Sequence, residues 1–569
     1  VGGLIGYLQT SVALTAGSLV SVVPSGTTKA VTGPRWVGGL VGYSASNLAS
    51  SGLGFTGDVT ATGSAGAVGG LFGRSNGALA SSTTQGTVSG GGTAGGLVGL
   101  AEGAGGFTQV SSSASVTTTG TSISFGTGGL VGIYQHAGTL DRGTATGNVV
   151  GGGLVGGLVG RATSNATDVG LIDSTASGNV SNTGGSGSRS GGLVGEYNLT
   201  GEMQRVRADG TVAGGDLAGG LVGLYQSSAP LREASQTGTQ VSGSGYVGGL
   251  VGFSNSSAFV DVDAVADVSS AAIGQRFLGG LAGRTAGSIT DATASGDVTA
   301  TGLSGTAYLG GLVGRSEGSG RSITTSSASG AVSNASETNA GAAGGLVGWA
   351  SHGSITSSSA SGAVSGGLYG GGIVGYFDPS SGDLSGLTAT GAVSSRGDAG
   401  GLLGFGQGTG TLSSSSASGN VSSSNSSTYS VGGAVGYTRM SGGINGVSAT
   451  GTVNGGSQTG GVVGFHDTTG PLANISTTTA TVTGHNWVGG LVGYSWAASI
   501  SGLTAHANVV HTSNAGAAGG LAGFHSGAIA DSTATGQVSG GNNVGGLIGM
   551  AAGAGAKLNL SASGNVSTT

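Results

Sequence analysis

Apolar residues recur along this chain in one short segment, a leucine and a valine set between glycines. The first intact copy is Gly38-Gly39-Leu40-Val41-Gly42, and nineteen copies align between Gly2 and Gly549. The first and last copies start 545 − 2 = 543 residues apart over eighteen intervals, so the mean period is about 30 residues. A fixed period of this size predicts stacked repeats, each of which contacts only its neighbours.

A second segment follows each copy, and its apolar and hydroxyl residues alternate with period two. In the stretch from Ile355 to Val364 the small or apolar face is predicted to point inward; it comprises Ser358, Ala360, Gly362 and Val364. The opposite face is predicted to point outward and comprises Ser359, Ser361 and Ala363. Alternation of this kind, with much glycine and no 3.6-residue period, favours a half-buried strand over a helix.

The Gly-Gly-Leu-Val-Gly motif has a different pattern, because its two apolar residues are adjacent. If the motif is a strand, Leu40 and Val41 point to opposite faces, and both faces must be buried. One face would fill the interior of the repeat. The other would meet either another layer of the same coil or another molecule, with the glycines leaving room for a second backbone.

The position directly after the motif is aromatic in many repeats. The residues at this position are Tyr7, Tyr43, Phe253, Trp349, Tyr376, Phe405, Tyr437, Phe465, Tyr494 and Phe524. Arginine takes the position at Arg74, Arg161, Arg284 and Arg315. If successive repeats pair as parallel strands about 4.8 Å apart, these side chains form an aromatic ladder on which arginine can stack.

These patterns predict an all-β fold, a parallel β-solenoid with one coil for each repeat of about 30 residues. Right-handed coiling is expected, because parallel crossovers strongly prefer that hand. We expect one solenoid over residues 1–569, with about 18–19 coils and a length of roughly 90 Å. Since the chain opens at Val1-Gly2-Gly3, inside a repeat, it is interpreted as a fragment of a longer protein.

The paired segments resemble the GLUG-motif repeat of secreted bacterial surface proteins. Gly489-Gly490-Leu491-Val492-Gly493-Tyr494, with Thr504 to Val509, is one such repeat. The resemblance extends over nearly the whole chain, with departures at 152–160, where the motif is doubled, at 261–268, and in the first repeat. It implies a parallel β-solenoid in an adhesin-like region, located outside the cell or at its surface.

Composition and charge exclude several classes of function. The net charge of −6 is spread thinly, without a basic patch for nucleic acid, and the absence of cysteine excludes disulfides and thiolate metal sites. The chain has no run of eighteen apolar residues, so no membrane span is predicted. The histidines are interpreted as lying in loops and outward positions: His136, His352, His466, His485, His506, His511 and His525. With no paired-histidine zinc motif and no cluster of acids, neither an enzyme nor a cofactor is expected.

Three weaker groupings admit a ligand. Asp267 and Asp297 occupy the same place in adjacent repeats, with Asp261 and Asp263 nearby, and could bind Ca²⁺; the alternative is a solvated acidic face. Outward hydroxyl pairs could order water or bind ice, or simply form a neutral surface: Thr293/Ser295, Thr388/Thr390 and Thr533/Thr535. The aromatic ladder could stack sugars or serve only for packing.

The sequence therefore predicts a structural repeat region of an extracellular fibre or adhesin stalk. Its partner would be a second copy of itself, contacted through the doubly apolar motif and the aromatic ladder. A carbohydrate-binding or ice-binding solenoid remains the alternative, with surface glycans as partners.

Overall fold

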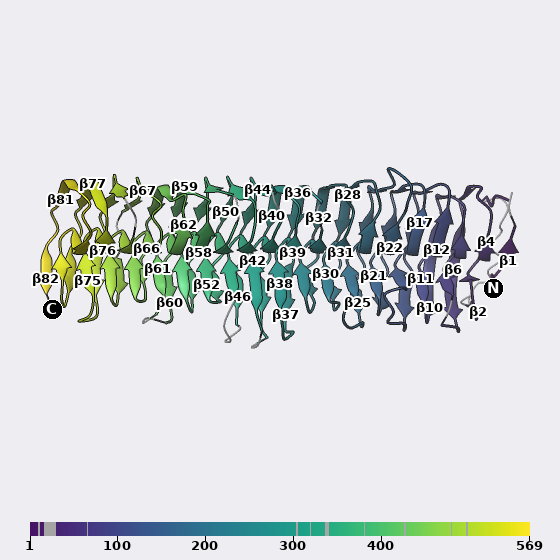
Figure 1. The fold of residues 1–569 in the computed structure, drawn as a ribbon. Coiled ribbons are helices and arrows are strands. Elements are labelled where there is room, and N and C mark those ends of the chain that lie inside the picture. Colours follow the sequence, from purple (N-terminus) through teal and green to yellow (C-terminus); the bar gives the residue numbers. More distant parts are fainter. Residues whose placement is uncertain are drawn as a thin grey trace. The chain divides into compact units, whose positions relative to one another are not determined.

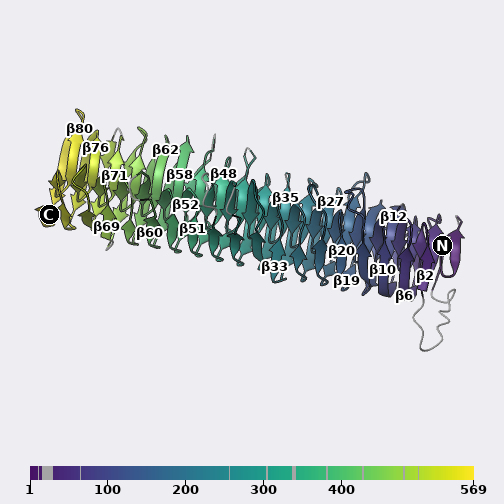
Figure 2. The ribbon, with the colours of Figure 1, turned by 90° about the horizontal axis from the view of Figure 1, so that it is seen from below.

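The computed structural model describes residues 1–9, 12–15, 30–64, 66–255, 257–302, 305–318, 320–335, 341–379, 382–425, 428–478, 481–496 and 499–568. Across these residues the chain is all-β without a helix, and about 18 turns of parallel strands form the predicted β-solenoid. The coils divide into two compact units. Unit 1 comprises Val1–Ala272 and Leu281–Thr285, and unit 2 comprises Ile273–Gly280 and Ala286–Thr569. Within each unit, equivalent strands of successive coils lie side by side (Figures 1 and 2).

One coil of unit 2 shows how the chain makes a turn. Its five strands are β47 (Ala342–Gly344), β48 (Val347–Ala350), β49 (Ser354–Thr356), β50 (Ser359–Ala360) and β51 (Val364–Gly366). Each strand pairs in parallel with its counterpart one coil later, as Val347 does with Val374. In each unit the first strand belongs to sheet A, the second to sheet B and the remaining ones to sheet C.

Sheets A and B contain the Gly-Gly-Leu-Val-Gly motif and the aromatic position that follows it. In unit 1, sheet A comprises β3 (Val37–Gly38), β7 (Ala67–Gly69), β11 (Thr93–Gly95), β16 (Gly126–Gly128), β21 (Leu154–Gly156), β26 (Arg189–Gly191), β30 (Leu217–Gly219) and β34 (Tyr246–Gly248). In unit 1, sheet B comprises β1 (Ile5–Leu8), β4 (Val41–Ser44), β8 (Phe72–Ser75), β12 (Val98–Gly103), β17 (Val131–His136), β22 (Val159–Thr163), β27 (Val194–Asn198), β31 (Val222–Tyr225), β35 (Val251–Ser254) and β39 (Ala282–Thr285).

Unit 2 repeats this arrangement. Its sheet A comprises β38 (Arg276–Gly279), β42 (Ala307–Gly310), β47, β52 (Tyr369–Gly371), β57 (Asp398–Gly400), β61 (Ser430–Gly432), β65 (Gln458–Gly460), β70 (Trp487–Gly489), β75 (Ala517–Gly519) and β79 (Val544–Gly545). Its sheet B comprises β43 (Val313–Ser316), β48, β53 (Val374–Phe377), β58 (Leu403–Gly408), β62 (Val435–Met440), β66 (Val463–His466), β71 (Val492–Ser495), β76 (Ala522–Ser526) and β80 (Ile548–Ala552).

The Gly-Gly-Leu-Val-Gly motif forms a corner, and its prediction as a doubly buried strand is wrong. In unit 2 the chain leaves β47 at Gly344, bends at Gly345 and Leu346, and enters β48 at Val347. Both Leu346 and Val347 are fully buried within the coil. Their N–H groups donate to one acceptor, the carbonyl of Ile373 in the next coil, at 3.0 and 2.8 Å. The apolar pair therefore fills its own coil and leaves nothing for a second molecule.

Glycine is required at the corner because two backbones meet there. A Cβ atom on Gly344 would lie 1.9 Å from the carbonyl oxygen of Val347, and one on Gly345 would lie 2.1 Å from that of Gly372. No side chain fits at these separations. The recurrence of this motif thus reflects main-chain geometry as well as apolar burial.

The inward and outward faces of the second segment are confirmed, but the segment is not one strand. Ser358, Ala360 and Val364 are buried and Gly362, the fourth predicted inward residue, is half-buried, whereas Ser359, Ser361 and Ala363 are exposed. The strand is interrupted between β50 and β51, and a left-handed residue, Ser357 (φ 50°), turns the chain between β49 and β50. Equivalent left-handed residues, including Arg142, Asp173 and Thr325, recur in other coils.

Each unit has one continuous core, in which the corner leucines form a column. In unit 1 the amide of Leu40 donates to Leu71 and that of Leu71 to Leu97; in unit 2 the amide of Val462 donates to Leu491 and that of Leu491 to Leu521. The predicted alignment of the corner leucines is confirmed within both units. A single solenoid over residues 1–569 and its right-handed coiling stay predictions.

Candidate functional site

The ten predicted ladder residues occupy one position in sheet B, the third residue of the strand. In unit 2 an unbroken run of seven, from Trp349 to Phe524, pairs coil by coil. In unit 1, Tyr7 pairs with Tyr43, and Phe253 lies between Leu224 and Arg284. Tyr7 is 56% exposed and Phe524 only 5%, while the other eight are half-buried. The predicted ladder exists, and it is longest in unit 2.

The ring planes of the unit 2 ladder are not all parallel. Tyr376, Phe405 and Tyr437 stack with centroids 5.1 and 5.0 Å apart and interplanar angles of 4° and 6°. Phe465 stands nearly perpendicular to both of its neighbours, at 89° and 83°. Stacked rings cover one another's faces, so the middle of the ladder presents ring edges instead of open faces.

A second aromatic column, on sheet A, was not foreseen from the sequence. It lies seven residues before the ladder position, so that Tyr369 packs on Tyr376 at 5.2 Å and Trp487 packs on Tyr494 at 5.4 Å. In unit 2 its members are Phe277, Tyr308, Tyr369 and Trp487; in unit 1 the same position holds Tyr246 and, directly before β3, Trp36. Each of these aromatic residues lies two positions before a Gly-Gly pair, and this spacing in the sequence could have revealed the column.

Arginines at the ladder position stack on rings, as predicted. Arg74 lies 4.8 Å from the Tyr43 centroid, Arg284 4.9 Å from Phe253, and Arg315 4.1 Å from Trp349. Arg161 instead faces the buried carboxylate of Glu196 at 3.7 Å, and Arg189 of sheet A also pairs with that carboxylate. The same position is thus largely charged or aliphatic in the middle of unit 1 and aromatic in unit 2.

Planar side chains, four of them polar, lie two residues after the ladder position in five successive coils of unit 2. They are Asp378, Gln407, Arg439, Asp467 and Trp496. Asp467 accepts hydrogen bonds from the Tyr437 hydroxyl at 2.6 Å and from Arg439 Nε at 2.9 Å. Gln407 donates to the Tyr376 hydroxyl at 3.3 Å. Amide, carboxylate and guanidinium groups therefore border the rings along several coils.

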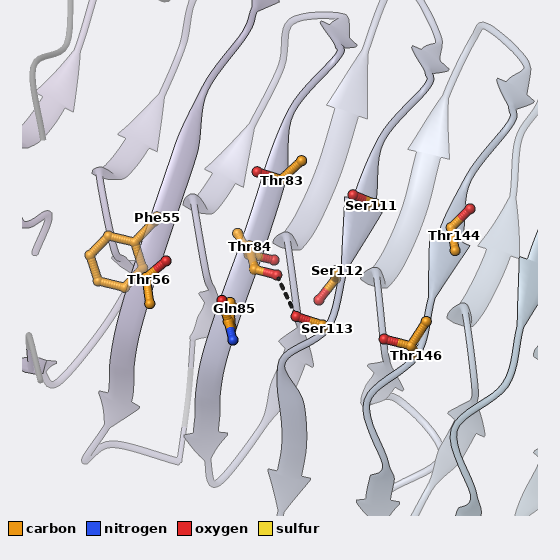
Figure 3. Close-up of a pocket in the computed structure, with 10 residues that line it drawn as sticks. All are labelled: Phe55, Thr56, Thr83, Thr84, Gln85, Ser111, Ser112, Ser113, Thr144 and Thr146. Carbon is orange, nitrogen blue, oxygen red and sulfur yellow. Dashed lines mark hydrogen bonds between the residues drawn. The ribbon is translucent and has the colours of Figure 1, made fainter.

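A hydroxyl-lined depression of about 270 Å³ lies on sheet C of unit 1 (Figure 3). It is lined by Phe55, Thr56, Thr83, Thr84, Gln85, Ser111, Ser112, Ser113, Thr144 and Thr146. The Ser113 hydroxyl donates to the Thr84 carbonyl at 3.4 Å. With neutral hydroxyl and amide groups alone, this surface can bind water or a hydroxylated ligand, but it offers no acid or base for catalysis.

The four calcium candidates divide between the units. Asp261, Asp263 and Asp267 lie on the surface of unit 1, and Asp297 lies on the surface of unit 2. Asp297 Oδ1 accepts a hydrogen bond from the Ala331 amide at 2.7 Å, as Asn179 Oδ1 does from Thr211. Among the described residues, no group of three or more histidines and acids is placed to hold a metal ion. Asp297 thus has a structural role in joining coils, and the calcium site stays a prediction.

Four histidines contradict the prediction that all lie in loops or point outward. His136, His466 and His525 are fully buried in sheet B strands, and His511 is 4% exposed. Neither ring nitrogen of His136 or His466 has a hydrogen-bond partner. Burial lowers the pKa of each of these two imidazoles to about 4. In sheet B, Tyr437 pairs with Phe465 and the buried Thr438 pairs with His466. The imidazole of His466 therefore takes the same inward direction as the side chain of Thr438.

One carboxyl group, that of Asp398, is buried in sheet A of unit 2. Asp398 of β57 occupies the sheet A position between Tyr369 and Ser430, and it accepts a hydrogen bond from the Ser430 amide at 2.8 Å. Burial raises the pKa of Asp398 to about 7, against the opposing effect of the Ser430 hydrogen bonds. No repeat pattern in the sequence distinguishes Asp398 from the other acids.

Comparison with known proteins agrees with the repeat architecture. The family model of the GLUG motif matches residues 278–299 and 339–365. GLUG repeats are therefore present at these two places, which confirms that part of the sequence analysis. No curated protein and no solved structure matches the chain. No helix among the described residues is long and apolar enough to cross a membrane.

Proposed function

Starting from GLUG repeats folded as coils of a parallel β-solenoid, we propose that this chain is the structural repeat region of an extracellular fibre or adhesin stalk. The observation that carries the proposal is main-chain continuity: within each unit, every corner repeats the same hydrogen bonds to the next coil. Such ladders resist bending and pulling without depending on particular side chains. The role is mechanical, with no catalytic activity and no resident cofactor.

The outer surface supports a location outside the cell. Charged residues make up only 7% of the chain, and serine, threonine, asparagine and glycine supply its polarity. The absence of cysteine removes any dependence on the redox state of the surroundings. Recovery of the native protein in the secreted or surface fraction is expected; recovery in the cytoplasm alone contradicts this location.

Self-association, if it contributes to a fibre, must use side chains other than the corner pair. Leu346 and Val347 are inaccessible, whereas most ladder rings are half-exposed. We propose that copies contact one another through these ring edges. Sedimentation velocity over a hundredfold range of concentration tests this: we expect a rising weight-average mass, and electron microscopy should show joined particles. A constant monomer mass with solitary particles excludes self-association.

An ice-binding surface is a second candidate, favoured by the outward hydroxyl pairs. Thr388 and Thr390 are both exposed, on either side of the buried Ala389. Hydroxyl groups in such ranks are available to ordered water. Inhibition of ice recrystallisation by the wild type, and its loss on Thr390→Lys, is the expected result for this candidate. An inactive wild-type protein removes it.

A further inference from the structure

Trp496 is a large aromatic residue exposed on the surface of unit 2. It is 45% exposed, whereas the seven neighbouring ladder rings are half-buried or, at Phe524, buried. Its indole packs on Tyr494 at 5.4 Å and on Phe524 at 5.5 Å, with interplanar angles of 65° and 67°. Trp487 supports the same two rings from sheet A. The indole is therefore held by a four-ring cluster and still faces solvent.

Polar groups suited to hydroxyl recognition lie beside this cluster. Asp467 occupies the position equivalent to Trp496 one coil earlier, and Arg439 the position two coils earlier. The Asp467 carboxylate is bonded to Arg439 and to the Tyr437 hydroxyl, which fixes its orientation. Its side chain is 30% exposed and that of Arg439 is 55% exposed, so both keep capacity for a ligand.

The orientation of the ladder rings limits the positions at which a flat ligand could stack on an open ring face. Stacking of sugars along the whole ladder would require open ring faces, and Tyr376, Phe405 and Tyr437 cover one another. Trp496 projects from the ladder and combines a large accessible indole with fixed polar neighbours. An exposed aromatic face beside carboxylate and guanidinium groups is the combination that recognises a pyranose, whose C–H face is apolar and whose rim carries hydroxyls.

We propose that Trp496, Asp467 and Arg439 form a saccharide-binding site on unit 2. A sugar ring would stack on the indole, and its hydroxyls would donate to Asp467 and accept from Arg439. Adjacent sugars of an extended chain would pass over the polar side chains towards Gln407. This binding activity is independent of the mechanical role proposed above.

A glycan array probed with the full chain tests the site, followed by fluorescence titration with the strongest-binding oligosaccharide. We expect binding by the wild type, a loss of at least about tenfold for Trp496→Ala, and a smaller loss for Trp496→Phe. Asp467→Asn should weaken binding with little change in thermal stability. Tyr7→Ala is the matched control, since Tyr7 is an exposed ladder ring of unit 1, and its affinity should equal that of the wild type.

Two outcomes overturn the proposal. One is the absence of any glycan binding by the wild type, and the other is equal affinity for Trp496→Ala and the wild type when both show the same melting temperature. If Trp496→Ala abolishes self-association in sedimentation and the array stays empty, Trp496 is a protein contact instead. Failure of the stalk proposal would appear in sedimentation and fractionation, which glycan binding does not affect.

Discussion

At the scale of single residues, the corner glycines are positions that tolerate no side chain. A side chain at the corner would collide with the backbone, whereas a glycine such as Gly386 elsewhere in the coil has free space beside it. Gly371 and Gly386 represent these two cases in one coil of unit 2. A Cβ on Gly371 would lie 1.9 Å from the Val374 carbonyl oxygen, while one on Gly386 meets no atom closer than 3.5 Å.

Replacing these two glycines by alanine should therefore have unequal effects. Gly371→Ala must displace two backbones, and we expect it to lower the free energy of unfolding by roughly 3–5 kcal/mol or to prevent folding. Gly386→Ala adds only the strain of a left-handed alanine (φ 63° at present), about 1 kcal/mol. Urea denaturation of both variants measures the difference. Equal losses would show that crowding at the corner is unimportant.

The buried imidazole of His466 predicts a loss of stability in acid. Its pKa is about 4 in the folded chain and 6.5 as its ordinary value, so the unfolded chain binds the extra proton first as pH falls. The contribution is complete above pH 6.5 and declines as pH drops towards 4, by about 3 kcal/mol in total. Unfolding should become easier over that range, as measured by urea midpoints.

His466→Thr is the matched variant for this effect. Threonine already occupies the equivalent buried position one coil earlier, at Thr438, and serine does so one coil later, at Ser495. The variant should lose much of the acid sensitivity between pH 6.5 and 4 that arises in unit 2. An unchanged pH profile would mean that His466 is not the responsible group.

At the scale of strands and sheets, the buried Asp398 of sheet A makes stability depend on pH in the direction opposite to that of His466. Its carboxyl has a pKa of about 7 in the folded chain and 3.8 ordinarily, so the folded chain retains the proton longer. Its contribution is complete below pH 3.8 and is lost as pH rises through 7, by up to about 4 kcal/mol. Asp398→Ser, which copies Ser430 in the next strand, should raise stability at pH 8 and leave it nearly unchanged near pH 4, as judged by urea midpoints.

The elements that could be predicted from sequence were those with a strict period. Alternation placed Ala360 and Val364 inward correctly, because a pleated strand fixes side-chain direction. The same rule misled at Leu346 and Val347, since a bend lets adjacent residues share the interior. Alternation along the sequence stops predicting side-chain direction wherever the chain bends. The glycines are the only sign of this bend in the sequence.

The candidate site was predicted only in part, for a related reason. The ladder from Trp349 to Phe524 followed from repeat alignment, because equivalent residues must stack in parallel coils. The facing rings, such as Trp487, depend on how sheet A folds back on sheet B at the corner, which alignment does not reveal. Repeat alignment also does not show that His466 is buried. Its inward direction depends on where the sheet B strand begins after the corner.

At the scale of the whole molecule, the repeat predicts that coils can be removed in phase. Deleting residues 372–400 joins Gly371 to Gly401 and restores a complete corner, with Phe405 then following Trp349 in the ladder. We expect this variant to fold with a modest loss of stability, since each coil interacts only with its neighbours.

Deleting residues 372–386 removes the corner and should prevent correct stacking, although fewer residues are lost. Circular dichroism and limited proteolysis distinguish the two outcomes. If both deletions fold equally well, neighbouring coils are not held by matched corners. If neither folds, unit 2 behaves as one indivisible body instead of a series of additive coils.

At each corner, two main-chain amides share one carbonyl acceptor in the next coil, and this arrangement affects how the repeat can evolve. The bonded groups belong to the main chain, so any coil that keeps the glycines can follow any other. Slippage during DNA replication, which adds or drops a whole period, would yield a foldable product without compensating substitutions. Related lineages should therefore differ in how many coils they encode more readily than in the chemistry of a single corner.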